Sequence, residues 1–328
     1  MRKFDRWLLA GALLLASIVA PAARAATDPV AVVAAVKGRV EISTGHSRAA
    51  VRAVFGRALE RGDKVTVGTG GSATLFFNDG NVIELSERSA LTIGGRVVAG
   101  AHSAALPGDV FAQVSRFVTA GSRQTGLVAM ADMRSDADAS LPLLLAPRRS
   151  AVLDDAPTLR WRTVIGAKGY RVRVTTASGA EVWTREVAAT DGAEQALAYP
   201  GDAPRLVAAT EHGWEVEAFD AKGTLRREST TLRVLGSEAR GSVRTNLARI
   251  TESAGGERSP AARFLAGSYL SGLGLYEEAT LQFRALAALD PASPAPHEAL
   301  GNLYLSVGLT DRAAAEFQHA LALQRDAR

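Results

Sequence analysis

The C-terminal part of the chain repeats itself at a fixed distance, and this constrains its fold more than any other feature. Residues 260–293 and 294–327 align without a gap, so matching positions are 34 residues apart. The matching residues are Pro260, Gly267, Gly274, Ala279 and Phe283, which recur as Pro294, Gly301, Gly308, Ala313 and Phe317. Self-similarity at one period indicates units that stack on their neighbours and share a core. We expect two helical hairpins, because small residues at Gly267 and Ala279 let paired helices approach closely.

This pattern resembles the tetratricopeptide repeat, a helix–turn–helix unit with the same period. The chain departs from that repeat at Arg263 and His297, where it favours tryptophan, and at Ala266, where it favours leucine. The resemblance implies a helical region over 236–328 that contains the hairpins 260–293 and 294–327.

Two such repeats need cover from elsewhere, because about three are required for a stable stack. A preceding helix over 242–253, with Val243, Leu247 and Ile250 on one face, is one source of cover. The other possible sources of cover are the middle domain and a second chain.

Tetratricopeptide proteins usually receive a partner peptide or helix on the concave face that their first helices line. The resemblance assigns Phe264, Ser268, Glu298 and Asn302 to that face as candidate partner-binding residues. Asn302 falls where many such repeats bond a ligand backbone, whereas Glu298 stands where the lysine of a carboxylate-binding clamp would be. The alternative is that the repeats only stack and make no external contact.

Residues 1–25 have the three parts of a secretory signal peptide. Basic residues within the first six positions precede an apolar run over 8–22, and Ala23-Arg24-Ala25 forms an A-x-A cleavage pattern. The run is shorter than the roughly 20 residues that span a bilayer, which disfavours an uncleaved anchor. We expect cleavage after Ala25, a mature chain without a transmembrane segment and a periplasmic location, with full secretion left open.

Charge and cysteine content exclude several classes of function. The formal net charge is +4, and the signal segment contributes +3 of it, from four basic residues against Asp5. The mature chain is therefore near neutral, and we expect no nucleic-acid partner. The chain has no cysteine, which excludes disulfides, cysteine nucleophiles and a lipid-modified N-terminal cysteine.

The region 26–120 is predicted to be a glycine-rich β domain. The segment GTGG at 68–71 raises the question of a phosphate-binding loop, which needs a helix after it so that amide groups face the anion. The residues that follow, SATLFF, have a strand pattern instead. We therefore predict hairpin turns at Gly70-Gly71 and at Asp79-Gly80, because these residues tolerate the positive φ of tight turns.

The same region resembles the FecR domain, a periplasmic module named after the iron-citrate transport regulator. The matching positions are Gly38, Val40, Leu59, Gly62-Asp63, Thr69-Gly70, Asp79-Gly80, Leu85 and Leu91. The resemblance implies a small β-structure without catalytic residues of its own. Regulator-type members carry a cytoplasmic anti-sigma segment and a membrane span before the domain. Here a signal peptide stands in that place, which puts signalling to a sigma factor in doubt.

A polar stretch over 121–140 is predicted to link this domain to a second β domain over 141–235. Its short alternating strands favour an immunoglobulin- or fibronectin-like antiparallel sandwich. The tryptophans Trp161, Trp183 and Trp214 all lie in it, either as core residues or as a platform that stacks on sugar rings. Trp183, between polar neighbours, is the candidate for an exposed glycan-stacking residue.

The sequence contains no recognisable catalytic motif. We find no G-x-S-x-G elbow, phosphate-binding loop, H-E-x-x-H or dinucleotide fingerprint. The five histidines are spread over the predicted domains at spacings that match no metal site, namely His46, His102, His212, His297 and His319. We therefore predict no catalytic residues, cofactor or metal. An unrecognised hydrolase would need a pocket where histidine and carboxylates converge from different strands.

Together these features predict a multidomain α+β protein with a FecR-like β domain, an immunoglobulin-like β-sandwich and C-terminal tetratricopeptide-type helices. The predicted function is that of an exported, non-enzymatic interaction or scaffold protein of the bacterial cell envelope. It would dock a protein partner through its repeats in a regulatory or assembly role. The alternative is a glycan-binding envelope protein, with peptidoglycan as its ligand.

Overall fold

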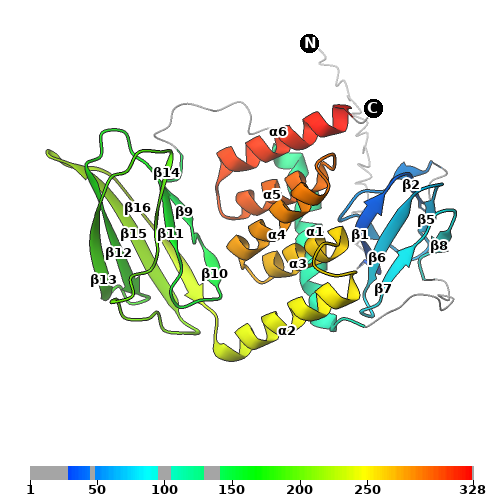
Figure 1. Cartoon of the computed structure of the whole chain (residues 1–328), viewed down its shortest axis with the longest axis horizontal. Coiled ribbons are helices and arrows are strands. Elements are labelled where there is room, and N and C mark those ends of the chain that lie inside the picture. The colour runs from blue at the N-terminus through cyan, green and yellow to red at the C-terminus, as the bar shows by residue number, and fades with distance from the viewer. Residues whose placement is uncertain (1–28, 45–48, 95–104, 129–140, 327–328) are drawn as a thin grey trace, which may run out of the picture.

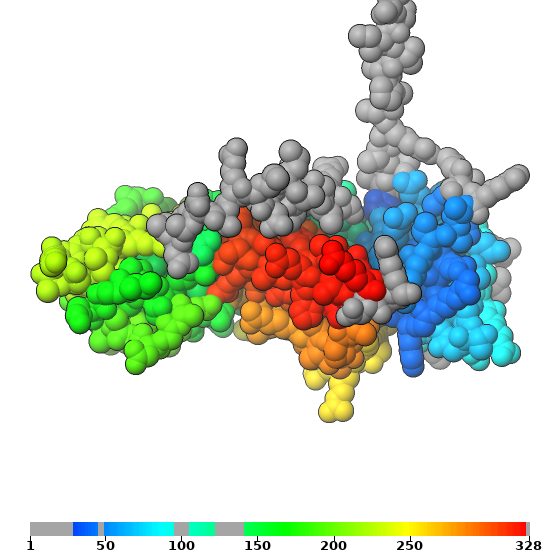
Figure 2. Space-filling model, turned by 90° about the horizontal axis from the view of Figure 1, so that it is seen from above, coloured from blue at the N-terminus to red at the C-terminus, as the bar shows by residue number. Residues whose placement is uncertain are grey.

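A computed structural model describes residues 29–44, 49–94, 105–128 and 141–326 of the chain. It is a mixed fold in which antiparallel β-sheets are followed by C-terminal helices (Figure 1). In space the helices lie between the two β parts, as Figures 1 and 2 both show. Within the described ranges, no helix is both long and apolar enough to cross a membrane.

The N-terminal β part consists of two sheets that enclose one apolar core. Its strands are β1 (Ala31–Lys37), β2 (Val40–Ser43), β3 (Val51–Arg52), β4 (Ala58–Leu59), β5 (Lys64–Val67), β6 (Ser72–Phe77), β7 (Val82–Leu85) and β8 (Ala90–Thr92). The sheet orders are β4-β1-β6-β7 and β3-β2-β5-β8, with antiparallel neighbours. Val65 and Val67 face inward along β5, as the alternation predicts.

The two predicted turns of this part have different roles. Asp79-Gly80 joins the antiparallel neighbours β6 and β7, and Gly80 has φ 90°, so the predicted hairpin is confirmed. The GTGG segment is also a tight turn followed by a strand, with Gly70 at φ 68°. It is not a hairpin, because it joins β5 of one sheet to β6 of the other. That prediction was wrong, since alternation along a strand does not reveal which sheet the strand enters.

Helix α1 (Gly108–Val128) corrects the predicted domain boundaries. It covers the end of the predicted β domain and the first part of the predicted linker, whose remainder, 129–140, lies outside the described residues. Its apolar side chains recur at the helical period: Val110, Phe111, Val114, Phe117 and Val118. Valine, threonine and glycine are poor helix formers, so packing rather than propensity holds this segment helical.

The middle of the sequence forms a β-sandwich. Its strands are β9 (Leu144–Ala146), β10 (Ser150–Val152), β11 (Leu159–Arg162), β12 (Gly169–Thr176), β13 (Glu181–Ala188), β14 (Glu194–Leu197), β15 (Glu211–Asp220) and β16 (Gly223–Val234). The sheet orders are β10-β16-β15-β12-β13 and β14-β11-β9. Neighbours are antiparallel except for β10, which lies parallel to β16. Along β11, β12 and β15 every second side chain is buried, as the period of two of a strand predicts: Leu159, Trp161, Tyr170, Val172, Val174, Trp214, Val216 and Ala218.

The C-terminal helices form two hairpins preceded by one helix. They are α2 (Ser237–Ser253), α3 (Pro260–Gly272), α4 (Tyr276–Leu289), α5 (Ala295–Ser306) and α6 (Thr310–Asp326). Helices α3 and α4 pair in the first hairpin, and α5 and α6 pair in the second. The predicted covering helix is present, because α2 packs against α3 and buries Val243 and Ile250.

Each repeated glycine packs against the repeated phenylalanine of its own hairpin. A Cβ atom on Gly267 would lie 2.6 Å from Cε1 of Phe283, and one on Gly301 would lie 2.7 Å from Cε1 of Phe317. Each ring therefore rests on the glycine of its own hairpin. The same contact in both units explains why glycine and phenylalanine recur together.

The change Gly267→Ala should lower the free energy of unfolding by about 1–3 kcal/mol, because the added methyl group forces the Phe283 ring out of its position. Equilibrium urea denaturation measures this effect. Gly241→Ala is the matched control, since this glycine of α2 has no atom within 4 Å of an added Cβ. The control should stabilise the chain by up to about 1 kcal/mol. Equal effects of the two changes would contradict the packing described here.

Candidate functional site: the groove of the helical repeats

The face of α3 and α5 that carries Phe264, Ser268, Glu298 and Asn302 is called the groove below. Helix α1 lies over this face, mainly against α3 and more lightly against α5 (Figure 1). Phe264 is 3% exposed and Ser268 is 0% exposed, while Glu298 and Asn302 are half-buried. The expectation of an open docking face is thereby corrected, because the chain fills the groove with its own helix.

Aromatic contacts hold α1 on two sides. Phe117 stacks on Phe283 of α4, with ring centroids 5.3 Å apart and an interplanar angle of 22°. Phe111 meets Phe76 of β6 edge-on, also at 5.3 Å. Such pairs contribute beyond their buried area, so α1 binds the helices and the N-terminal sheet together.

Phe264, predicted to contact a partner, instead joins the repeats to the N-terminal β part. Its ring centroid lies 5.9 Å from that of Phe55. A Cβ atom on Gly56, which has φ 70°, would lie 3.2 Å from Cζ of Phe264 and 3.8 Å from Cγ2 of Val118. Only glycine fits this position without strain. The backbone at Gly56 therefore packs directly against the Phe264 ring.

Close backbone contacts fix the direction of α1 in the groove. A Cβ atom on Gly272 would lie 2.7 Å from Cβ of Gln113, and Nη1 of Arg116 donates to the Gly272 carbonyl oxygen at 3.3 Å. Gln113 thus lies at the C-terminal end of α3, whereas Val118, later in α1, lies near Phe264, earlier in α3. The two helices therefore run antiparallel. Further along, Gly121 meets the side chain of Asn302.

A partly buried polar network that sequence reasoning missed ties α1 to α2 and α3. Nδ2 of Asn246 donates to Oδ2 of Asp109 at 3.1 Å and to the Tyr269 hydroxyl oxygen at 2.9 Å. Burial raises the pKa of Tyr269, so its hydroxyl stays protonated. The signal was present in the sequence, because Asn246 is a polar residue on the inward face of the helix predicted from Val243 and Ile250.

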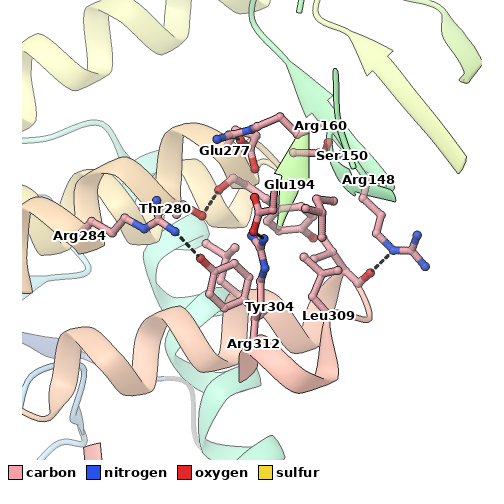
Figure 3. A pocket seen from close by; sticks show the side chains of 15 residues that line it. Arg148, Ser150, Arg160, Glu194, Glu277, Thr280, Arg284, Tyr304, Leu309 and Arg312 are labelled. Atoms are coloured by element: carbon pink, nitrogen blue, oxygen red, sulfur yellow. Dashed lines mark hydrogen bonds and ion pairs between the residues drawn. The ribbon is translucent and has the colours of Figure 1, made fainter. Parts of the chain in front are cut away.

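A second concave feature lies between the sandwich and the hairpins (Figure 3). Its cavity measures about 30 Å³, enough for about one or two water molecules. Arg160 pairs with Glu277, and Arg312 pairs with Glu194. Each pair joins a strand of the sandwich to a helix, so this feature is a charged junction with little room for a substrate.

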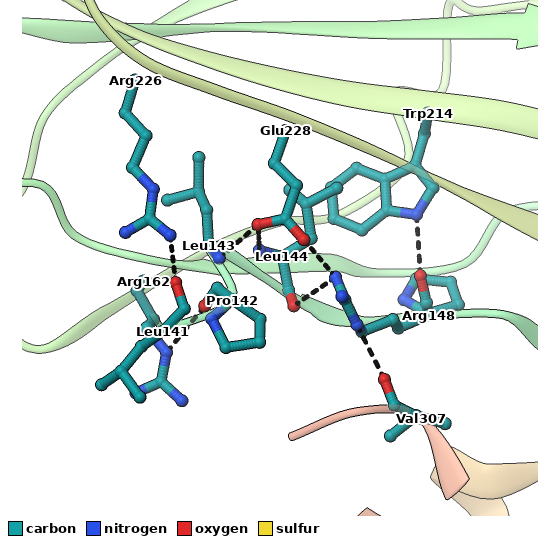
Figure 4. Close-up of polar contacts among 11 residues, drawn as sticks. Leu141, Pro142, Leu143, Leu144, Arg148, Arg162, Trp214, Arg226, Glu228 and Val307 are labelled. Atoms are coloured by element: carbon teal, nitrogen blue, oxygen red, sulfur yellow. Dashed lines mark hydrogen bonds and ion pairs between the residues drawn. The ribbon is translucent and has the colours of Figure 1, made fainter. Parts of the chain in front are cut away.

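Further arginines strengthen the same junction (Figure 4). Nε of Arg148 donates to the Val307 carbonyl oxygen at 2.8 Å, while the same guanidinium pairs with Glu228. Nη2 of Arg162 lies 2.6 Å from Oδ2 of Asp311. The sandwich is therefore attached to the second hairpin in part through guanidinium groups, beside the apolar packing of Leu145 and Ala151 in the core of the helices.

The glycan-stacking candidate Trp183 is buried, and the expectation of its exposure was wrong. It is 8% exposed and meets Tyr199 edge-on, with centroids 5.5 Å apart. Trp161 and Trp214 are buried in the same core. The period of two along β13 explains the difference, because it turns Trp183 inward while its polar neighbour Thr184 faces outward.

The described residues include no group of three or more histidine, aspartate or glutamate side chains that could hold a metal ion. His297 and His319 stack with centroids 4.1 Å apart, and Nδ1 of His297 lies 2.8 Å from Oε2 of Glu316. His212 is buried in the sandwich. The candidates His46 and His102 lie outside the described residues.

Comparisons with known proteins give little guidance to function. No family model and no curated protein matches the chain. CopC from Methylosinus trichosporium OB3b is 15% identical over 29% of this chain and 93% of that chain, with a TM-score of 0.22. Domains FN1–FN3 of chicken CNTN1 are 11% identical over 62% and 56% of the two chains, with a TM-score of 0.19. β-Glucuronidase from Ruminococcus gnavus is 10% identical over 54% and 41%, with a TM-score of 0.21. Scores this low carry no inference about activity.

Glu298, in the groove, should make the stability of the folded chain depend on pH. Burial raises its pKa, and a hydrogen bond from Nε2 of Gln324 at 2.7 Å opposes this in part. A carboxyl group whose pKa is higher in the folded chain destabilises the fold when it is ionised. Glu298→Gln should therefore raise Tm at pH 7. The gain should shrink as pH falls from the raised pKa toward the ordinary glutamate value, about 4.3.

Thermal unfolding from about pH 3 to pH 8 measures this dependence. Glu252→Gln is the control, because Glu252 is an exposed glutamate of α2, and surface changes of this kind have small effects. A lower Tm of Glu298→Gln at pH 7 would mean that the ionised carboxylate stabilises the fold.

Proposed function

We propose that the chain is an exported, non-enzymatic interaction protein that serves as a scaffold in the bacterial cell envelope, in a regulatory or assembly role. In this proposal the hairpins are tetratricopeptide-type repeats that bind a protein partner, and the N-terminal part is a FecR-type β domain. One observation carries the proposal: the groove of the two hairpins holds an amphipathic helix, α1, through aromatic anchors. Helix-in-groove recognition by other proteins uses the same kind of surface.

Several sequence features support the individual parts of the proposal. The repeated contact of glycine with phenylalanine in both hairpins agrees with what the 34-residue period implies. The signal-peptide pattern of residues 1–25 supports export to the periplasm. The sequence has no recognisable catalytic motif, which supports a function without catalysis. The glycan-binding alternative loses its basis, because it required exposed tryptophans and these side chains are buried.

Site-specific photo-crosslinking in intact cells tests this function. A photoreactive residue is placed at Leu281 of α4 or Leu321 of α6, which are 64% and 52% exposed. The matched control position is Ile165 in the sandwich, which is 93% exposed. We expect a defined protein adduct from the helical positions and none from the control. The same adducts at all positions, or none anywhere, would overturn the proposal.

The test keeps the chain whole for a structural reason. The helices cover an apolar face of the N-terminal sheet that includes Val32 and Phe76. A chain without its helices would expose this face and bind other proteins nonspecifically.

A further inference from the structure

Two polar side chains of the groove lack a hydrogen-bond partner beneath α1. Oγ of Ser268 and Oδ1 of Asn302 are buried and unbonded among the residues that the structure describes. The two residues are 34 positions apart, so they occupy the same place in the two hairpins. Ser268 lies one turn from Phe264 and one turn from Gly272 on the face of α3 that α1 covers, so its hydroxyl group faces α1.

Helix α1 therefore matches the groove in shape but not in hydrogen bonding. Opposite Asn302 it presents Gly121, where an added Cβ would lie 2.8 Å from Nδ2. A glycine has no side chain that could bond the neighbouring Oδ1. A buried polar group without a partner costs more free energy than an ordinary hydrogen bond gains. The packing of α1 therefore carries this cost at two equivalent positions, Ser268 and Asn302.

The apolar face of α1 holds it in place, although its own sequence favours a helix weakly and it lies on α5 only lightly. On the groove side it stacks Phe117 on Phe283, and at its start Asp109 accepts a bond from Asn246. A competing helix would have to replace this apolar packing and would gain the two missing hydrogen bonds.

We infer that the groove is the docking site for a helical segment of a protein partner, and that α1 occupies it until that segment binds. This inference rests on the proposed function. The segment would carry an apolar side chain in place of Phe117, against Phe283. It would carry a small hydrogen-bond donor in place of Gly121, opposite Asn302, and a polar group opposite Ser268. The partner segment binds only the conformation in which α1 is out of the groove, so its binding shifts the chain toward that conformation.

Hydrogen exchange in the full chain gives the first test. Removing the unbonded groups with Ser268→Ala and Asn302→Leu should tighten the hold on α1. The amides of residues 110–118 should then exchange at least about fivefold more slowly. Thr280→Val is the matched control, because this hydroxyl is bonded to the Tyr276 carbonyl oxygen at 2.8 Å and belongs to α4. Unchanged or faster exchange of α1 in the double variant would overturn the inference.

Binding of labelled peptides gives the second test. Peptides of residues 107–128, carrying Gly121→Ser or Gly121→Ala, are added to the full chain with Phe117→Ala, in which the resident helix is weakened. The serine peptide should bind about fivefold more tightly than the alanine peptide, because its hydroxyl group bonds Oδ1 of Asn302. This difference should vanish when the chain also carries Ser268→Ala and Asn302→Leu.

Equal binding of the two peptides, or no binding of either, would overturn the inference. It would leave the proposed function standing if a partner is still crosslinked through Leu281 or Leu321. Loss of those adducts would remove the proposed function itself, so the two failures are distinguishable.

Discussion

The simultaneous packing of α1 against the N-terminal sheet and the repeat helices holds most of this molecule in one body. A single apolar core extends from Val32 and Phe76, through Val114 of α1, to Phe283 and Phe317 of the hairpins. Strand β1 contributes to two cores at once, because Val33 faces the space between the N-terminal sheets and Val32 faces the helices. Neither the N-terminal part nor the first hairpin has a complete hydrophobic environment without α1.

The sandwich is attached by different physics. Its own core contains the three tryptophans. Its contacts with the hairpins combine apolar packing of Leu145 and Ala151 with ion pairs and bonds from arginine to carbonyl oxygens. Exposed charge pairs are weakened by salt, whereas apolar packing of the kind that α1 makes is not. Polar interfaces within a chain also permit relative domain motion. Of the ion pairs at this junction, Arg160–Glu277 is the most exposed, with side chains 44% and 36% exposed, so salt screens it more than the others.

Local pattern predicted the local structure, and it failed where a distant segment supplies the contact. The period of the hairpins and the inward residues of β5, β11, β12 and β15 followed from spacing alone. Helix α1 did not, because its valines and glycines favour other structures and its apolar partners are distant in the sequence. Phe283, on which Phe117 stacks, lies 166 residues further along the chain. Alternation failed at Trp183, where the polar neighbours were weighed more heavily than the period of two. The groove residues lie on the face assigned to them, but nothing near them in sequence reveals their occupant.

The sheet face formed by Val32 and Phe76 has a consequence for the biosynthesis of the chain. These residues are made early, while the helix that covers them from the repeats, α3, comes roughly 200 residues later, which at usual rates of synthesis is on the order of 10–40 s. During that interval α1 can cover part of this face through Phe111 and Phe76, while the part that α3 covers stays exposed, and exposed apolar surface of this kind causes aggregation. The N-terminal sheet therefore completes its packing only after α3, in the last third of the chain, has been made.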